Sequence, residues 1–167
     1  MNGAERRSLA GTGLAVSRLG IGGGSLANAA GAEGVRAVVD TAWDEGLRHF
    51  DTAALYAGGK SERRLGAALA GRPRDAFVLS TKIGRFVGPD GRDAFDYSAA
   101  GTEAAIAAAL TRLRLESLDI VFIHDVIHDL LGEAFERRFA EAMEGAVPVL
   151  LRLRAHGVIR AGNVTVN

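Results

Sequence analysis

The chain has 167 residues and carries 20 basic (Lys and Arg) and 20 acidic side chains, so its formal net charge is zero. This balance leaves no excess positive charge for binding nucleic acid or an anionic membrane surface. The absence of cysteine excludes disulfides, thiolate nucleophiles and metal sites that need cysteine ligands. The length is typical of one domain, and we expect residues 1–167 to form a single domain.

The N-terminal stretch and the apolar runs bear on the location of the protein in the cell. Residues 1–9 are polar and lack the apolar centre of a signal peptide. The apolar runs at residues 104–110 and 120–123 are far shorter than the ~20 residues that cross a membrane. We therefore expect a cytoplasmic protein that does not contact a membrane.

Short β-rich runs alternate with longer helical stretches along the chain. Residues 8–16 carry a Gly-Thr-Gly turn between apolar positions, which predicts a small hairpin. Strands are then predicted at residues 19–22, 47–51, 77–81, 118–123 and from 158 towards 167. Helices are predicted at residues 32–45, 61–70, 101–114 and 133–156, from apolar positions at helical spacing. A polar, glycine-rich loop is predicted over residues 84–96.

Local signals support several of the helix ends. Gly46 ends the first helix, and the pair Ser61-Glu62 suits a helix N-terminus through both capping and the helix dipole. Pro148 lies inside the long C-terminal helical region, where we expect it to start or kink a segment. We expect no helix directly after the glycine-rich turn at residues 22–24.

The regular alternation of strands and helices predicts an α/β fold, with a parallel sheet and helices packed outside it. Two architectures satisfy this pattern. One is an open, doubly wound sheet, and the other is part of a (β/α) barrel.

Four polar residues occupy the positions where parallel α/β folds place their chemistry, at the carboxyl ends of strands. Asp51 closes one predicted strand, and Tyr56 lies five residues later in the loop. Lys82 and His124 follow the next two predicted strands. We therefore expect a carboxylate, a phenol, an ammonium and an imidazole to meet at one rim of the sheet.

These four side chains are suited to proton transfer at a carbonyl or alcohol oxygen. A tyrosine phenol in water has a pKa of about 10, and a neighbouring ammonium favours its phenolate form. A carboxylate paired with the lysine holds the ammonium in place, while an imidazole can donate a hydrogen bond to a substrate oxygen. No side chain supplies hydride, so reduction or oxidation at this site requires a nicotinamide cofactor.

Several segments of the sequence, including those that carry these four residues, resemble the aldo-keto reductase family. The segment FDTA at residues 50–53, followed by YAGGKSERRLG at 56–66, resembles the family pattern FDTA…YGxGxSExxLG. STKIGR at residues 80–85 and LDIVFIHD at 118–125 resemble the segments that carry the family's lysine and histidine. The resemblance covers nearly the whole chain and is greatest to the branch of sugar and pyridoxal dehydrogenases. In one departure, Ala57 stands where the family usually has glycine.

The resemblance implies the N-terminal portion of a (β/α)8 TIM barrel, ending after the fifth barrel strand. It implies that Tyr56 donates or accepts the proton and that Lys82 and Asp51 tune the acidity of Tyr56. It also implies that His124 orients the substrate oxygen. For the cofactor, NADP or NAD, it implies Gly23 and Gly24 near the nicotinamide ribose, beside Asp51, with Asn167 holding the carboxamide. The implied substrate is a small carbonyl compound or sugar.

Two weaker readings of the sequence remain beside this one. The segment GGGSLA at residues 22–27 formally matches a dinucleotide-binding fingerprint of the doubly wound type. The chain also fits a catalytically inactive half-barrel, a fragment or scaffold that self-associates through its exposed strand edges. The spacing of His49, His128 and His156 predicts no metal site.

Overall fold

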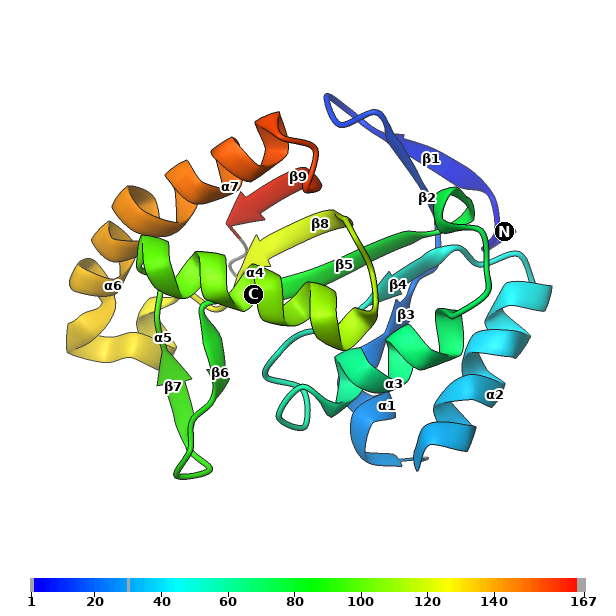
Figure 1. The fold of residues 1–167 in the computed structure, drawn as a ribbon, viewed down its shortest axis with the longest axis horizontal. Helices are drawn as coiled ribbons and strands as arrows, with labels where there is room; N and C mark the ends of the chain where they lie inside the picture. Colours follow the sequence, from blue (N-terminus) through cyan, green and yellow to red (C-terminus); the bar gives the residue numbers. More distant parts are fainter. Residues whose placement is uncertain (1, 30, 165–167) are drawn as a thin grey trace.

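The structure is a computed structural model that describes residues 2–29 and 31–164. Its centre is a sheet of five parallel strands (Figure 1). In spatial order these are β3 (Ile21–Gly22), β4 (His49–Asp51), β5 (Val78–Ile83), β8 (Leu118–Ile123) and β9 (Ile159–Val164). The predicted α/β class and all five predicted parallel strands are therefore confirmed.

The strand order decides between the two architectures that the sequence leaves open. A doubly wound sheet reverses its strand order at a switch point. The described strands instead follow the order of the chain without a reversal, so each crossover adds its strand on the same side. This progression builds a (β/α)8 barrel. The described residues accordingly form an incomplete TIM barrel.

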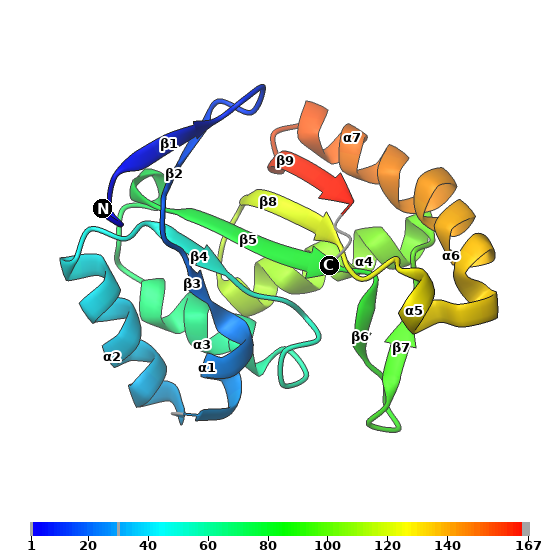
Figure 2. The same cartoon turned by 180° about the vertical axis from the view of Figure 1, so that it is seen from behind.

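Helices cover one face of the sheet. Figure 1 shows α3 and α4 in front of the strands, and Figure 2 shows the strands from the opposite side. The helices α2 (Gly31–Asp44), α3 (Lys60–Leu69) and α4 (Ala99–Leu113) lie close to their predicted ranges. Their buried apolar side chains form the main core against the outer face of the sheet.

The inner face of the sheet carries a second, smaller apolar cluster, formed by Leu14, Val78, Ile120 and Ala161. Leu14 belongs to the predicted N-terminal hairpin, whose strands β1 (Arg6–Leu9) and β2 (Leu14–Ser17) pair antiparallel. The hairpin therefore contributes to the core near the amino end of β5 and leaves the carboxyl ends of the strands uncovered.

Two predictions about connecting segments are wrong. The expected loop over residues 84–96 contains an antiparallel hairpin of β6 (Arg85–Val87) and β7 (Asp93–Phe95). Each strand has only three residues, which is too short for an alternation of apolar and polar positions to show in the sequence. Directly after β3, a short helix α1 (Gly23–Ala29) begins where the sequence predicts none. Glycines disfavour a helix start by local propensity, and here a tertiary hydrogen bond from Ser61 Oγ holds the carbonyl of Gly23.

The long helical region predicted over residues 133–156 is divided into several segments. The helical structure begins earlier than predicted, with α5 (His128–Leu131), and continues through a 3₁₀ turn (Gly132–Ala134), α6 (Phe135–Glu141), a π-helical turn (Ala142–Ala146) and α7 (Val147–Ala155). A Cβ on Gly145 would lie 2.8 Å from the carbonyl oxygen of Tyr97, so the π-helical turn requires glycine at this close approach. Pro148 stands in the first turn of α7, as predicted.

The last predicted strand corresponds to β9, and Asn167 lies outside the described residues. Across the part of the chain that the structure describes, no helix has both the length and the apolar character needed to cross a membrane.

Candidate active site

Two neighbouring strands bring Asp51 and Lys82 together at the carboxyl end of the sheet. The β4–β5 register places Asp51 opposite Ser80, and Lys82 lies two residues further on the same face of β5. Lys82 Nζ donates to Asp51 Oδ2 at 2.5 Å and to the carbonyl oxygen of Thr52 at 2.9 Å. Because the Lys82 side chain is only 8% exposed, this pair is its main source of electrostatic compensation.

Tyr56 lies in the turn that follows β4. Backbone hydrogen bonds, among them Tyr56 N to Ala53 O at 3.2 Å, fold this segment back over the end of the sheet. Lys82 Nζ lies 4.7 Å from the centre of the Tyr56 ring, within the range of a cation–π contact. Ala57, directly after it, has a left-handed backbone with φ of 50°, which explains why glycine is the family's usual residue there.

His124 follows β8 and completes the predicted group. Its ring lies edge-on to Tyr56, with ring centres 6.0 Å apart and an interplanar angle of 84°. Burial lowers the pKa of His124 to about 4, while the neighbouring Asp125 acts in the opposite direction and Lys82 lowers the pKa further. The imidazole is therefore neutral near pH 7 and keeps one N–H as a donor. Among the described residues, its buried Nδ1 has no hydrogen-bond partner.

The structure thus brings all four predicted side chains, Asp51, Tyr56, Lys82 and His124, into one cluster. Two of the predicted cofactor residues lie beside it. A Cβ on Gly24 would come within 3.7 Å of the Tyr56 ring, and a Cβ on Gly23 would lie 2.7 Å from the carbonyl oxygen of Asp51. Asp51, which belongs to both predicted sets, is in the cluster itself, and Asn167, the fourth predicted cofactor residue, is outside the described residues.

Three further residues hold the loop after β8, and sequence reasoning assigned no role to them. Tyr97 is fully buried and its hydroxyl donates to the carbonyl oxygen of His124 at 2.7 Å. Asp125 accepts a hydrogen bond from Arg85 at 2.5 Å and lies 3.4 Å from His124 Nε2. Arg85 and Asp125 stand in segments that resemble the family, at residues 80–85 and 118–125, and this resemblance was the available signal for them.

The pair Ser61-Glu62 has a different role from the predicted helix cap. The N-cap of α3 is Gly59, and no side chain caps this helix, so the capping prediction is wrong. Ser61 Oγ instead donates to Gly23 O and accepts from the Thr52 hydroxyl. Glu62 is fully buried and pairs with Arg112 of α4. Both residues therefore connect α3 to neighbouring elements behind the site.

The remaining histidines are dispersed. His128 and His156 are exposed, whereas His49 is half-buried on the inner face of β4, where burial lowers its pKa. Over residues 2–29 and 31–164, no group of three or more His, Asp or Glu side chains has an arrangement that could hold a metal ion.

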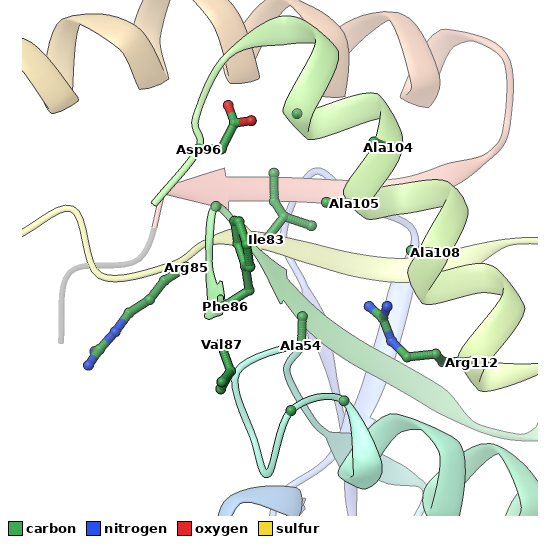
Figure 3. Close-up of a pocket in the computed structure, with 14 residues that line it drawn as sticks. Ala54, Ile83, Arg85, Phe86, Val87, Asp96, Ala104, Ala105, Ala108 and Arg112 are labelled. Atoms are coloured by element: carbon green, nitrogen blue, oxygen red, sulfur yellow. The ribbon is translucent and has the colours of Figure 1, made fainter. Parts of the chain in front are cut away.

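A cavity of about 310 Å³ lies beside the turn that carries Tyr56. Its walls come from Gly58 and Gly59 of that turn, Phe86 of β6, and small residues of α4 such as Ala105 and Ala108 (Figure 3). None of the four clustered side chains lines this cavity. The cavity is therefore separate from the cluster of Asp51, Tyr56, Lys82 and His124.

The fold is an incomplete parallel barrel, and its site has a lysine–carboxylate pair beside a tyrosine and a histidine. This combination is typical of a class of barrel oxidoreductases. Comparison with known proteins identifies the family. The Aldo/keto reductase family matches this chain over residues 18–166. The chain belongs to this family.

Characterised relatives and solved structures agree with this membership. The chain is 37% identical to D-threo-aldose 1-dehydrogenase from a Pseudomonas species, over 91% of this chain and 50% of that protein. It is 30% identical to pyridoxal 4-dehydrogenase of Microbacterium luteolum, over 100% of this chain and 57% of that protein. A crystal structure of a putative aldo-keto reductase from Pseudomonas aeruginosa superposes with a TM-score of 0.82 at 31% identity, covering 98% of this chain and 61% of that chain. The chain therefore spans about half the length of the curated relatives it matches.

Proposed function

We propose that this chain carries the proton-transfer site of an oxidoreductase that moves hydride between a nicotinamide cofactor and a carbonyl or lactol carbon. The observation that supports this most directly is the position of Lys82, which lies 2.5 Å from the Asp51 carboxylate and 4.7 Å from the Tyr56 ring centre. An ammonium held between a carboxylate and a phenol suits an acid–base tyrosine.

Each of the four side chains has one task in this proposal. The Tyr56 hydroxyl gives its proton to the carbonyl oxygen during reduction and takes it back during oxidation. Lys82 stabilises the phenolate that remains, and Asp51 holds the ammonium there. His124 is neutral because burial lowers its pKa to about 4, so it orients the substrate oxygen by donating a hydrogen bond without adding charge.

The residues around Tyr56 fit a nicotinamide cofactor, either NADP or NAD. Gly24 presents backbone without a side chain next to the Tyr56 ring, so a flat ring can approach Tyr56 there, whereas Gly23 packs against Ser61 and the carbonyl oxygen of Asp51. The cofactor supplies the hydride that no side chain can provide. Among the solved relatives, an aldo-keto reductase from Klebsiella pneumoniae in complex with NADPH has a TM-score of 0.68 at 26% identity, over 94% of this chain and 48% of that chain.

The proposed substrate class is a small carbonyl compound or sugar. Two curated relatives are named as an aldose dehydrogenase and a pyridoxal dehydrogenase, and L-galactose dehydrogenase of Arabidopsis thaliana is 31% identical over 99% of this chain and 49% of that protein. Sugars and pyridoxal both offer an aldehyde or its cyclic hemiacetal, which is the group that the proposed chemistry oxidises.

The replacement Tyr56→Phe tests this function. It removes only the hydroxyl, so we expect turnover of aldose with NAD or NADP to fall at least about 1,000-fold while nicotinamide fluorescence still reports cofactor binding. The thermal melt of the variant should stay within a few degrees of the wild type. Turnover that survives the loss of this hydroxyl would overturn the assignment.

A second candidate function is that of a non-catalytic interaction module. Strands β3 and β9 are the outer strands of the described sheet, and beside β9 lies an apolar cavity of about 210 Å³ with Leu151 and Met143 on its rim, 60% and 43% exposed. These features favour self-association of two copies along this edge. If this proposal holds, we expect sedimentation to show a dimer, which Leu151→Glu should dissociate. We also expect residues 1–167, as a single domain, to melt in one cooperative transition.

A further inference from the structure

Four polar side chains form a compact patch on the inner face of the β4–β5 pair. His49 and Asp51 lie two residues apart on β4, and Ser80 and Lys82 lie two residues apart on β5. Since Asp51 pairs directly with Ser80 in the strand register, each strand contributes two neighbours on the same face. Ser80 has no role in the proposed function, although it is only 1% exposed and stands at the centre of this patch.

Ser80 and Lys82 hold the two oxygens of one carboxylate. The Ser80 hydroxyl donates to Asp51 Oδ1 at 2.6 Å, and Lys82 Nζ donates to Asp51 Oδ2 at 2.5 Å. A carboxylate held at one oxygen can rotate about its Cβ–Cγ bond, whereas one held at both oxygens cannot. Both donors come from β5, so the orientation of Asp51 is fixed by a single strand.

His49 extends the hydrogen bonds of this patch beyond Ser80. Its Nε2 lies 3.4 Å from Ser80 Oγ. The hydroxyl has one hydrogen, which it donates to Asp51, so towards His49 its oxygen acts as the acceptor and Nε2 carries the hydrogen. Burial lowers the pKa of His49 and Lys82 acts in the same direction, while Asp51 and Asp119 act against it. The hydrogen bonds therefore run in one direction, from His49 through Ser80 to Asp51.

We propose that Ser80 is a positioning residue, which locks the Asp51 carboxylate in the orientation that keeps the Lys82 ammonium against the Tyr56 ring. This inference rests on the proposed function for its catalytic consequence, but the positioning itself is a property of the chain alone. Without the hydroxyl, Asp51 Oδ1 is free to turn towards water, because 29% of its side chain is exposed, and the ammonium loses its fixed partner.

The neighbouring residue supplies a matched control. Thr81 is also fully buried, and its hydroxyl donates at 2.7 Å to the Glu62 carboxylate, which is itself paired with Arg112. It thus makes the same kind of bond on the opposite face of the same strand, away from the proposed reaction. Thr81→Val and Ser80→Ala each remove one buried hydroxyl donor to a paired carboxylate.

The first measurement needs neither cofactor nor turnover. Lys60 and Lys82 are the only lysines in the chain, and Lys60 is exposed. In a ¹H–¹⁵N spectrum tuned to ammonium groups, Lys82 should give a sharp signal because its protons are held by Asp51 and Thr52, while Lys60 exchanges with water. We expect Ser80→Ala to broaden the Lys82 signal as strongly as the reference variant Asp51→Asn, and Thr81→Val to leave it sharp. An unchanged signal in Ser80→Ala would overturn the proposal.

The second measurement links positioning to catalysis. With turnover established, Ser80→Ala should lower kcat about tenfold and leave KM within twofold, since the loss concerns proton transfer rather than substrate binding. Thr81→Val should lower the melting temperature by a similar amount to Ser80→Ala and leave kcat unchanged. If the wild type shows no turnover, the proposed function fails while the ammonium spectrum still decides the role of Ser80. Equal losses of kcat in both variants would overturn that role.

Discussion

Lys82 Nζ on β5 and Asp51 Oδ2 on the neighbouring parallel strand β4 lie 2.5 Å apart. The same ammonium faces the ring of Tyr56, which lies in the turn that follows β4. One ion pair therefore connects the sheet to the turn that carries the acid–base residue. The consequences for activity and for stability can be separated by experiment.

Lys82→Met removes the charge between Asp51 and Tyr56. We expect activity to fall at least about 100-fold and the free energy of unfolding to fall by about 2 kcal/mol, because a partly buried carboxylate loses its partner. Lys60→Met, at the exposed start of α3, should change neither. Steady-state kinetics and urea unfolding measure the two effects. Equal behaviour of the two lysine variants would contradict the prediction.

The neutral state of His124 makes stability depend on pH. Its pKa is about 4 in the folded chain and near 6.5 when unfolded, so between these values the unfolded chain binds more protons. Stability is therefore complete above pH 6.5 and declines as the pH falls towards 4, by roughly 2–3 kcal/mol from this group. Urea unfolding at pH 7.5 and 5.0 measures the decline, which His124→Gln should reduce. A histidine resonance from residue 124 that titrates near 6.5 would be inconsistent with it.

Arg112 compensates a fully buried charge behind the site. Because the Glu62 side chain is 0% exposed and Arg112 Nε lies 2.5 Å from it, Arg112→Leu should cost about 3 kcal/mol of unfolding free energy. Adding Glu62→Gln should recover part of that cost, since the amide keeps an acceptor for the Thr81 hydroxyl and carries no charge. A double-mutant cycle by chemical denaturation measures the coupling; purely additive losses would contradict the pairing.

Ala57 departs from the family's usual glycine at a position where the backbone is left-handed. Ala57→Gly should therefore stabilise the chain by about 0.5–1 kcal/mol, since glycine adopts a positive φ without a Cβ penalty. The same substitution at Ala107, an exposed position within α4, should destabilise by about 1 kcal/mol because the backbone there is helical. Thermal melts of both variants should shift in opposite directions, and a shared direction would argue against backbone strain at residue 57.

Local patterns in the sequence were sufficient for most of the fold and for the predicted cluster. Asp51, Lys82 and His124 could be placed at one rim because parallel strands expose their carboxyl ends at the same edge. The 85–95 hairpin and the helix α1 were missed, since neither shows a local apolar period. The cap assigned to Ser61 failed because its hydroxyl bonds to groups that are distant in the chain.

The sequence by itself determined the family, the alternation of strands and helices, and the four side chains that could carry the chemistry. Only the tertiary structure decided which partners those side chains take: Ser80 for Asp51, Tyr97 for the carbonyl of His124, and Arg112 for Glu62. These partners are 27 to 50 residues apart in the chain. A periodic pattern depends on near neighbours, whereas such contacts depend on strand register and on how helices pack against the sheet, which emerge only when the whole fold is assembled.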